Sequence, residues 1–212
     1  MIAISTAFKR ALIGIEIDKK RECFELDANC KHSENILLNI DKLLDKMEKS
    51  FQENDSYGVV IGPGSFTGVR IATSLVKGFL AGEPNKKIVT LTSFELMAYT
   101  YIKHNHVENN FVCAIDALSG LYFICEFDKD GNKISQERMI DNDEFQKITL
   151  PVVSLSEEDV SSIKITPSAE ELLDLCMFKL SRENLSKAEE ILPLYLRKSQ
   201  AEVSLEERLK KS

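Results

Sequence analysis

The sequence predicts an α/β protein built from two topologically similar halves. Both halves open with an apolar strand that runs into a strand–turn–strand meander, at Ala3-Ile4-Ser5 and at Ala114-Ile115-Asp116. Strand and helix patterns alternate elsewhere, as in α/β folds, and the similar openings indicate an internal repeat. A chain of 212 residues accommodates two such units. We therefore expect subdomains at residues 1–108 and 109–212, with a cleft between them.

Three strands and a long helix are predicted at the start of the first half. Apolar runs or period-two alternation mark the strands, at residues 1–6, 11–18 and 22–27. A helix is predicted over residues 33–50, because apolar residues recur there at helical spacing. Ser33 is a favourable N-cap, and Glu34 lies in the first turn, where the helix dipole favours an acid.

A glycine-rich turn follows a short buried strand and leads into the next helix. The predicted elements here are a strand at 57–61, the turn at 62–68, a helix to about residue 81, a strand at 87–91 and a helix at 93–103. Gly82 and Pro84 end the helix that follows the turn.

The second half repeats the opening meander but has no clear counterpart of the long first helix. Its predicted elements are strands at 111–116 and 121–127, a strand at 151–155 and a helix at 167–180. Asp130-Gly131 is typical of a hairpin turn and predicts a third strand just after it. We expect residues 193–197 to be packed, and the charged helical stretch beyond them to be solvated or to face a partner.

Composition and charge restrict the classes of function. Hydrophobic residues make up 43% of the chain and charged residues 29%, which is typical of a soluble globular protein with a real core. The net charge is −7, and no basic stripe replaces phosphate counterions. The chain therefore either does not bind nucleic acid or relies on a partner for the positive surface.

Localisation and redox state follow from two further patterns. No charged and apolar leader precedes the first strand, and no apolar run approaches membrane-spanning length. We therefore expect a cytoplasmic protein that does not bind a membrane. The five cysteines are odd in number and form no CxxC motif, so reduced, buried thiols are the favoured interpretation over a disulfide.

The most informative segment is residues 62–71, Gly-Pro-Gly-Ser-Phe-Thr-Gly-Val-Arg-Ile. It follows a buried strand and opens a helix, whose free N–H groups could bind an anion. The spacing differs from Walker A, from the dinucleotide fingerprint and from a nucleophile elbow. Spacing alone therefore leaves open a structural turn at the helix start or an anion or nucleotide loop. The candidate loop residues are Gly62, Gly64, Ser65, Thr67 and Gly68.

The same ten residues resemble the signature of the TsaB (YeaZ) family. Weaker matches to this family occur along nearly the whole chain in the family's order. They are Ile2-Ala3-Ile4, His32-Ser33-Glu34 with Leu37-Leu38, residues 92–98, Ala114-Ile115-Asp116-Ala117 with Tyr122, and Pro193-Leu194-Tyr195-Leu196-Arg197.

This resemblance implies an actin/sugar-kinase/Hsp70-like (ASKHA) fold of two ribonuclease-H-like subdomains. It also implies a subunit of the bacterial complex that transfers threonylcarbamoyl from an adenylate to an adenosine beside the anticodon of ANN-decoding tRNAs, giving N6-threonylcarbamoyladenosine (t6A). Its partners would be the catalytic paralogue TsaD and the small ATPase TsaE. When alone the subunit would form a homodimer, and it would meet tRNA only through the complex.

The residues favour a non-catalytic role within such a complex. Ser5 replaces the acid that this superfamily uses at the first turn to hold a hydrated metal. The TsaD-type HxxxH pair is incomplete, because Ile36 lies four residues after His32. Ser65 and Thr67 have no histidine or acid placed near them for a triad.

Three other candidates have ordinary interpretations. His104 and His106 fit exposed linker residues better than a metal pair, and Asp116 fits a turn cap better than a site acid. We expect no catalytic residue, no metal site and no cofactor of the chain's own, with ATP and metal on partner subunits. The alternative is a nucleotide-binding protein, or a small-molecule kinase or hydrolase, of the ASKHA superfamily.

Two helices are the candidates for partner binding. The helix that begins after the glycine-rich turn is apolar nearly all round, and the first helix also carries apolar residues beyond one stripe. Either the two helices cover each other, or together they form half of a four-helix bundle with a partner. The resemblance implies the second. The predicted partner residues are Leu37, Ile40, Leu44, Val69, Arg70, Ala72, Thr73, Val76 and Leu80. Arg70 is the candidate for an interfacial ion pair or a contact with a carbonyl group.

Overall fold

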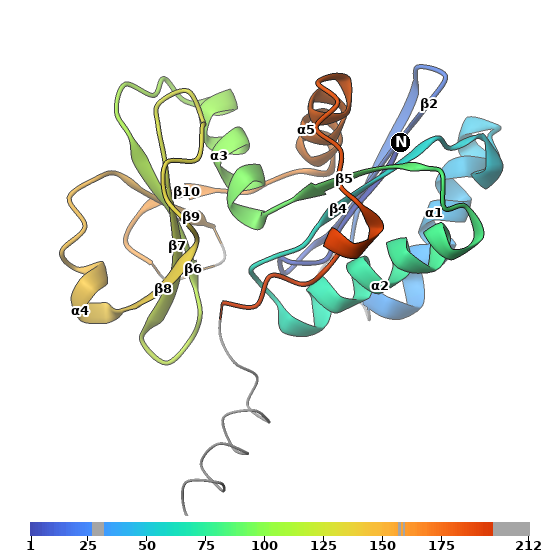
Figure 1. Ribbon diagram of the computed structural model, residues 1–212. Helices are drawn as coiled ribbons and strands as arrows, with labels where there is room; N and C mark the ends of the chain where they lie inside the picture. Colours follow the sequence, from blue (N-terminus) through green and yellow to red (C-terminus); the bar gives the residue numbers. More distant parts are fainter. Residues whose placement is uncertain (27–31, 157, 159, 197–212) are drawn as a thin grey trace, which may run out of the picture.

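The computed structural model describes residues 1–26, 32–156, 158 and 160–196, and it contains two five-stranded sheets (Figure 1). The first sheet has the order β3 (Lys20–Leu26), β2 (Ala11–Ile17), β1 (Ile2–Ser5), β4 (Ser56–Val60) and β5 (Lys87–Leu91). The second has the order β10 (Ile163–Ile165), β9 (Val152–Leu155), β6 (Phe111–Asp116), β7 (Leu121–Phe127) and β8 (Arg138–Asp141).

The two sheets share one topology, which confirms the repeat seen in the sequence. Read from the β8 end, the second sheet has the order 8-7-6-9-10, matching 3-2-1-4-5 in the first. In each sheet the opening strand pairs antiparallel with the strand that follows it and parallel with the fourth. The β1–β2 register sets Ile2 opposite Ile15, and the β6–β7 register sets Phe111 opposite Phe127.

Alternation along β1 directs its side chains to two different cores. Ile2 and Ile4 belong to the cluster that α1 (His32–Met47) and α2 (Phe66–Gly82) cover, whereas Ala3 belongs to the cluster that α5 (Ala169–Ser181) covers. Figure 1 shows α1 and α2 on one side of the first sheet and α5 on the other. The first sheet is thus buried on both faces.

Two helices are exchanged between the halves. Helix α3 (Ser93–His104) follows β5 in sequence but packs on β6, β7, β9 and β10 of the second sheet. Helix α5 follows the second sheet but packs on β1, β2, β3 and β5 of the first, and it also contacts α3. One continuous hydrophobic cluster therefore joins the halves across the boundary expected at residue 108.

The second sheet has much less helical cover on its outer face, as the sequence predicts. Helix α4 (Asn142–Phe145), the segment after it and Val160 lie on this face, in a small cluster of buried residues. The third strand of this half begins later than predicted. Asp128 accepts hydrogen bonds from the backbone N–H groups of Asp130 and Asn132, which extends the turn, and β8 begins only at Arg138.

The chain returns to the first half near its end. Ser186 N–H donates to the Ile88 carbonyl at 2.8 Å, and Leu194 N–H donates to the Ile61 carbonyl at 2.7 Å. Ile191, just after the short helix η2 (Ala188–Glu190), is fully buried among α1 and α2 residues. The packing predicted from residue 193 is thus confirmed as far as Leu196. Arg197 and the charged stretch lie outside the described residues.

No helix in the described part of the chain is long and apolar enough to cross a membrane.

A short 3-10 helix, η1 (Phe51–Glu53), connects α1 to β4. The side chains of His32, Ser33 and Glu34, which the sequence analysis singled out, lie outside the described part, as does Cys30.

Candidate functional site

The glycine-rich turn packs directly against the turn between β1 and β2. Ser65 N–H donates to the Ala7 carbonyl at 2.8 Å. A Cβ on Gly64 would overlap the Ala7 carbonyl oxygen, and a Cβ on Gly68 would overlap the Thr6 carbonyl oxygen. Gly64 also has a φ of +155°. These two glycines are therefore required for a close approach of two backbone segments.

Further hydrogen bonds fix the same turn. Ser93 N–H donates to the Gly62 carbonyl at 2.8 Å, and Thr6 Oγ1 donates to the Gly68 carbonyl. Ser65 Oγ accepts from Gly68 N–H at 3.2 Å and caps α2. Of the candidate loop residues, Ser65 and Thr67 are exposed and the glycines are wholly or partly buried. The packing of the turn and the capping of α2 explain why glycine occurs at positions 64 and 68 and serine at position 65. Anion binding by the turn stays a prediction.

Most of the predicted partner residues lie inside the chain's own core. The seven buried ones are Ile40, Leu44, Val69, Ala72, Thr73, Val76 and Leu80. Five of them share one cluster with the first sheet, which α1 and α2 both cover. These side chains stabilise the fold of this chain. Of the nine, only Leu37 and Arg70 are exposed in this conformation, and partner binding stays a prediction.

The surface that α1 and α2 do expose has a different composition. On α1, Leu37 and Leu38 are 50% and 49% exposed. On α2, an outer stripe at i, i+4, i+8, i+11 and i+15 is exposed along the helix. We call it the α2 stripe, and its members are Phe66, Arg70, Ser74, Lys77 and Ala81.

Three residues meet at the start of the α2 stripe. The Arg70 guanidinium carbon lies 3.8 Å from the centre of the Phe66 ring, and Arg70 Nε donates to Tyr195 Oη at 2.6 Å. The Phe66 and Tyr195 ring centres are 5.2 Å apart. The sequence predicts Arg70 as a partner residue but does not predict Phe66 or Tyr195. Both aromatic residues lie within the motifs that carry the family resemblance, and these motifs are the sequence signal that could have identified them.

The turn after β1, where the sequence has Ser5 in place of an acid, is closely packed among the described residues. Ser5 and Thr6 are fully buried, and Phe8 is buried in the cluster that joins the halves. Between the β1–β2 turn and Thr166 of the second half, the cavity has a volume of about 10 Å³. A cavity of this size holds at most about one water molecule.

The other candidate residues have structural contacts. Asp116 Oδ1 accepts from Leu118 N–H at 2.7 Å, so the predicted turn cap is confirmed. His104 is exposed as expected, but it is the last residue of α3 and not part of a linker, and its Nε2 lies 2.5 Å from Oε1 of the buried Glu171. His106 is exposed as expected. Among the described residues, no three His, Cys, Asp or Glu side chains are grouped so that they could hold a metal ion.

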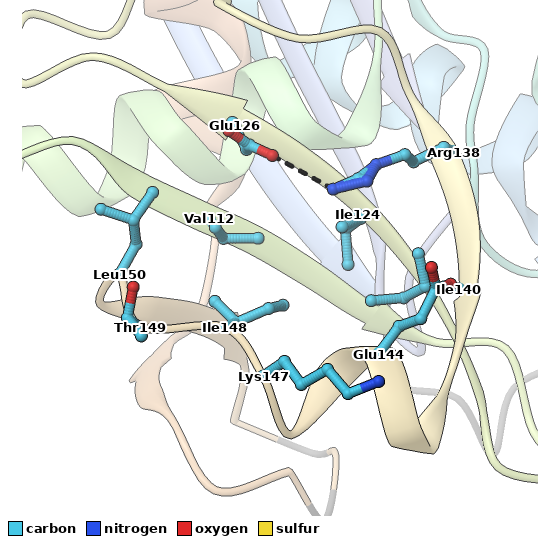
Figure 2. A pocket seen from close by; sticks show the side chains of 10 residues that line it. All are labelled: Val112, Ile124, Glu126, Arg138, Ile140, Glu144, Lys147, Ile148, Thr149 and Leu150. Carbon is cyan, nitrogen blue, oxygen red and sulfur yellow. Dashed lines mark hydrogen bonds and ion pairs between the residues drawn. The ribbon is translucent and has the colours of Figure 1, made fainter.

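A larger pocket lies on the outer face of the second sheet, away from the predicted site. It has a volume of about 380 Å³, and Figure 2 shows its apolar floor of Val112, Ile124 and Ile140. Arg138 and Glu126 form an ion pair at 3.2 Å on its rim, and Glu144 and Lys147 lie opposite. No motif in the sequence pointed to this pocket, because its lining comes from three strands, from α4 and from the segment that follows α4.

Comparisons with known proteins agree with this architecture. The family model described as tRNA N6-adenosine threonylcarbamoyltransferase (TsaD) matches residues 26–191. The tRNA threonylcarbamoyladenosine biosynthesis protein TsaB of Haemophilus influenzae is 26% identical over 124 residues, which is 58% of this chain. The match spans about half, 52%, of that relative's length.

Two solved structures from Pseudomonas aeruginosa have the same fold. One is described as similar to the peptidase YeaZ, with a TM-score of 0.76 and 21% identity, and the other as YeaZ, with a TM-score of 0.75 and 20% identity. Each comparison covers 92% of this chain and 98% of the solved one. The two sheets of equal topology and these neighbours agree with the predicted ASKHA-like fold. The chain therefore belongs to the family described as tRNA N6-adenosine threonylcarbamoyltransferase (TsaD), and it is similar to TsaB and YeaZ proteins.

Proposed function

We propose that this chain is a non-catalytic scaffold subunit of a bacterial complex that makes t6A on tRNA. Membership of the family and the name of the Haemophilus relative support a role in this pathway. In this proposal the TsaD-type paralogue is the direct partner and carries the chemistry. ATP and metal are bound by partner subunits, including a TsaE-type ATPase, and tRNA is met only through the assembled complex in the cytoplasm.

The observation that carries the scaffold assignment is the packing at the end of β1. Ser5 is buried and offers no charge for a metal, and its hydroxyl accepts a 3.4 Å hydrogen bond from Ala7 N–H. The neighbouring cavity of about 10 Å³ is far smaller than the several hundred Å³ that a small-molecule site usually needs. Both features support a chain that holds no metal or nucleotide at the turn after β1.

The exposed parts of α1 and α2 are the proposed docking surface. Leu37 and Leu38 are two neighbouring leucines, each about half exposed. Burying such side chains in an interface removes apolar area from water, at roughly 25 cal/mol per Å². The same surface is the proposed contact between two copies when the chain is alone, so a homodimer and the mixed complex would compete for it.

The proposal can be tested by size-exclusion chromatography with light scattering, on this chain alone and mixed with its cognate TsaD-type paralogue. We expect a mixed complex, and t6A formation on tRNA only when both proteins are present. The variant Leu37→Glu combined with Leu38→Glu should break the complex. Ile134→Glu is the matched control, because Ile134 is 48% exposed on the second half.

A charge introduced on the inner face of α2 would not test docking. In Val76→Glu, for example, the charge would replace a fully buried side chain and unfold the chain. Turnover of ATP or another substrate by the lone chain would contradict the scaffold assignment. It would then favour the nucleotide-binding or kinase alternative.

A further inference from the structure

Phe66, Arg70 and Tyr195 form an ordered cationic surface that we call the Arg70 platform. The guanidinium lies 3.8 Å from the Phe66 ring centre and 5.5 Å from the Tyr195 ring centre. Its Nε is held by the Tyr195 hydroxyl at 2.6 Å. An arginine restrained in this way loses little side-chain entropy when it binds a ligand.

Within the described ranges, no acid is paired with the platform. Arg10, Arg21 and Arg138 each lie within 3.2 Å of a carboxylate oxygen. Among the described residues, no carboxylate lies within ion-pair distance of Arg70, and its only hydrogen bond to a side chain comes from Nε. The two terminal NH2 groups of the guanidinium therefore have no partner within the described part of the chain. These groups form the fork that fits a planar oxyanion.

Charge is segregated along the same helix. Helix α2 contains Arg70 and Lys77 and no Asp or Glu, although the whole chain has a net charge of −7. Both cations lie on the exposed α2 stripe with Ser74 and Ala81, whose small side chains permit close approach of another backbone. The stripe is thus complementary to an acidic surface.

We infer that the Arg70 platform binds a carboxylate side chain of the partner protein and anchors one end of the α2 stripe in the complex. This inference rests on the proposed function and specifies the chemistry of its docking surface. A protein carboxylate fits better than a nucleic-acid phosphate, because a chain of net charge −7 repels a polyanion. Aromatic rings beside an interfacial arginine also exclude water and strengthen the ion pair.

The inference can be tested by isothermal titration calorimetry of the full chain with its cognate TsaD-type paralogue, at low and high salt. Arg70→Gln should weaken binding by about tenfold or more. Arg70→Lys should recover only part of this loss, because an ammonium group keeps the charge without the fork. The salt dependence of the affinity should be smaller for Arg70→Gln than for the wild type.

Arg182→Gln is the matched control. Arg182 is also exposed and lies 5.3 Å from an aromatic ring, that of Phe178, and it forms no ion pair within the described residues. Its replacement should change the affinity by less than about twofold, since a cation away from the interface contributes little. Thermal unfolding of each variant establishes that a loss of binding does not reflect a loss of folding.

The outcomes separate this inference from the proposed function. If the wild type forms no complex, both fail. If the wild type binds and Arg70→Gln binds equally well, the platform inference fails and the scaffold assignment stands. Loss of tRNA binding by the lone Arg70→Gln chain, with the protein complex unchanged, would identify a phosphate as the ligand and overturn the carboxylate assignment. Rescue of Arg70→Glu by one acid-to-lysine change on the partner would establish the pair.

Discussion

Arg70 and Tyr195 are 125 residues apart in the sequence, yet Arg70 Nε donates a 2.6 Å hydrogen bond to Tyr195 Oη. The contact joins the first turns of α2 to the returning C-terminal segment. Nearby, Leu194 N–H bonds to the Ile61 carbonyl just before the glycine-rich turn. Two of the motifs that resemble the TsaB family are therefore parts of one structural unit, in which the second orders the side chain of the first.

Tyr195→Ala should destabilise the protein by about 1 kcal/mol, because it removes the aromatic pair with Phe66 as well as the hydrogen bond. Tyr195→Phe keeps the ring and should cost less. Urea unfolding measures both free energies, and hydrogen exchange should show faster exchange of the Leu194 amide in Tyr195→Ala. Equal stability of Tyr195→Ala and the wild type would mean that the contact contributes nothing to holding the segment.

Gly68→Ala should destabilise the protein by about 2 kcal/mol or more, because the added methyl group overlaps the Thr6 carbonyl and neither backbone segment can move freely. Gly78→Ala is the matched control on the same helix. A Cβ there meets no atom within 4 Å, so this change should be neutral or stabilising by up to about 1 kcal/mol. Thermal and urea unfolding test the pair. Equal effects of the two substitutions would contradict a packing role for the signature glycine.

The described cysteines should react slowly with thiol reagents in the native protein. Burial raises the pKa of Cys23 to about 11 and the pKa values of Cys125 and Cys176 to about 12, and it raises that of Cys113 well above its ordinary value. Since the thiolate is the reactive form, little of it exists at pH 8.

Cys30 is the fifth cysteine and lies outside the described residues. The variant Cys30→Ser therefore leaves only the four described free cysteines to react. Labelling of this variant at pH 8 should be at least about tenfold slower in the folded than in the unfolded state. All four thiols should react with the reagent once the protein is unfolded. Fast labelling of the folded variant would show that the cores around these residues open readily.

Much of the fold could be predicted because its main elements are long enough to display a period. Strand β6 has the predicted limits, and helix α3 differs from its predicted range by one residue. Strand β10 and helix α4 have three and four residues, which is too short for a pattern to be read. The exchange of α3 and α5 between the sheets could not be predicted either, because the apolar stripe of a helix does not identify the sheet that the helix will cover.

The candidate site was harder to predict for a related reason. The apolar residues of α1 and α2 were identified correctly, but a helical wheel does not distinguish a side chain buried in its own core from one buried by a partner. Val76 and Leu37 have similar chemistry, yet one is fully buried and the other is 50% exposed. Tyr195 could not be placed beside Arg70 because no local pattern links residues so far apart.

Helices α3 and α5 are joined by a buried carboxylate whose ionisation should make stability depend on pH. Glu171 is 3% exposed and accepts hydrogen bonds from Ser168 N–H at 2.9 Å and Thr100 Oγ1 at 3.0 Å, and its Oε1 lies 2.5 Å from His104 Nε2. Burial alone would raise the pKa of Glu171. The contacts with Ser168, His104 and Thr100 outweigh it and hold the pKa below its ordinary value of 4.5.

The folded pKa of Glu171 is thus lower than the unfolded one, so ionisation of this carboxyl stabilises the native state. The contribution is complete above the unfolded pKa, which is close to the ordinary value of 4.5, and it is lost as the pH falls through the lower folded value. Urea unfolding between pH 7 and pH 3 should show a steeper loss of stability below about pH 4.5 in the wild type than in Glu171→Gln. The exposed neighbour provides the control, since Glu170→Gln should keep the wild-type slope. If Glu171→Gln also kept that slope, the α3–α5 contact would not depend on the charge of Glu171.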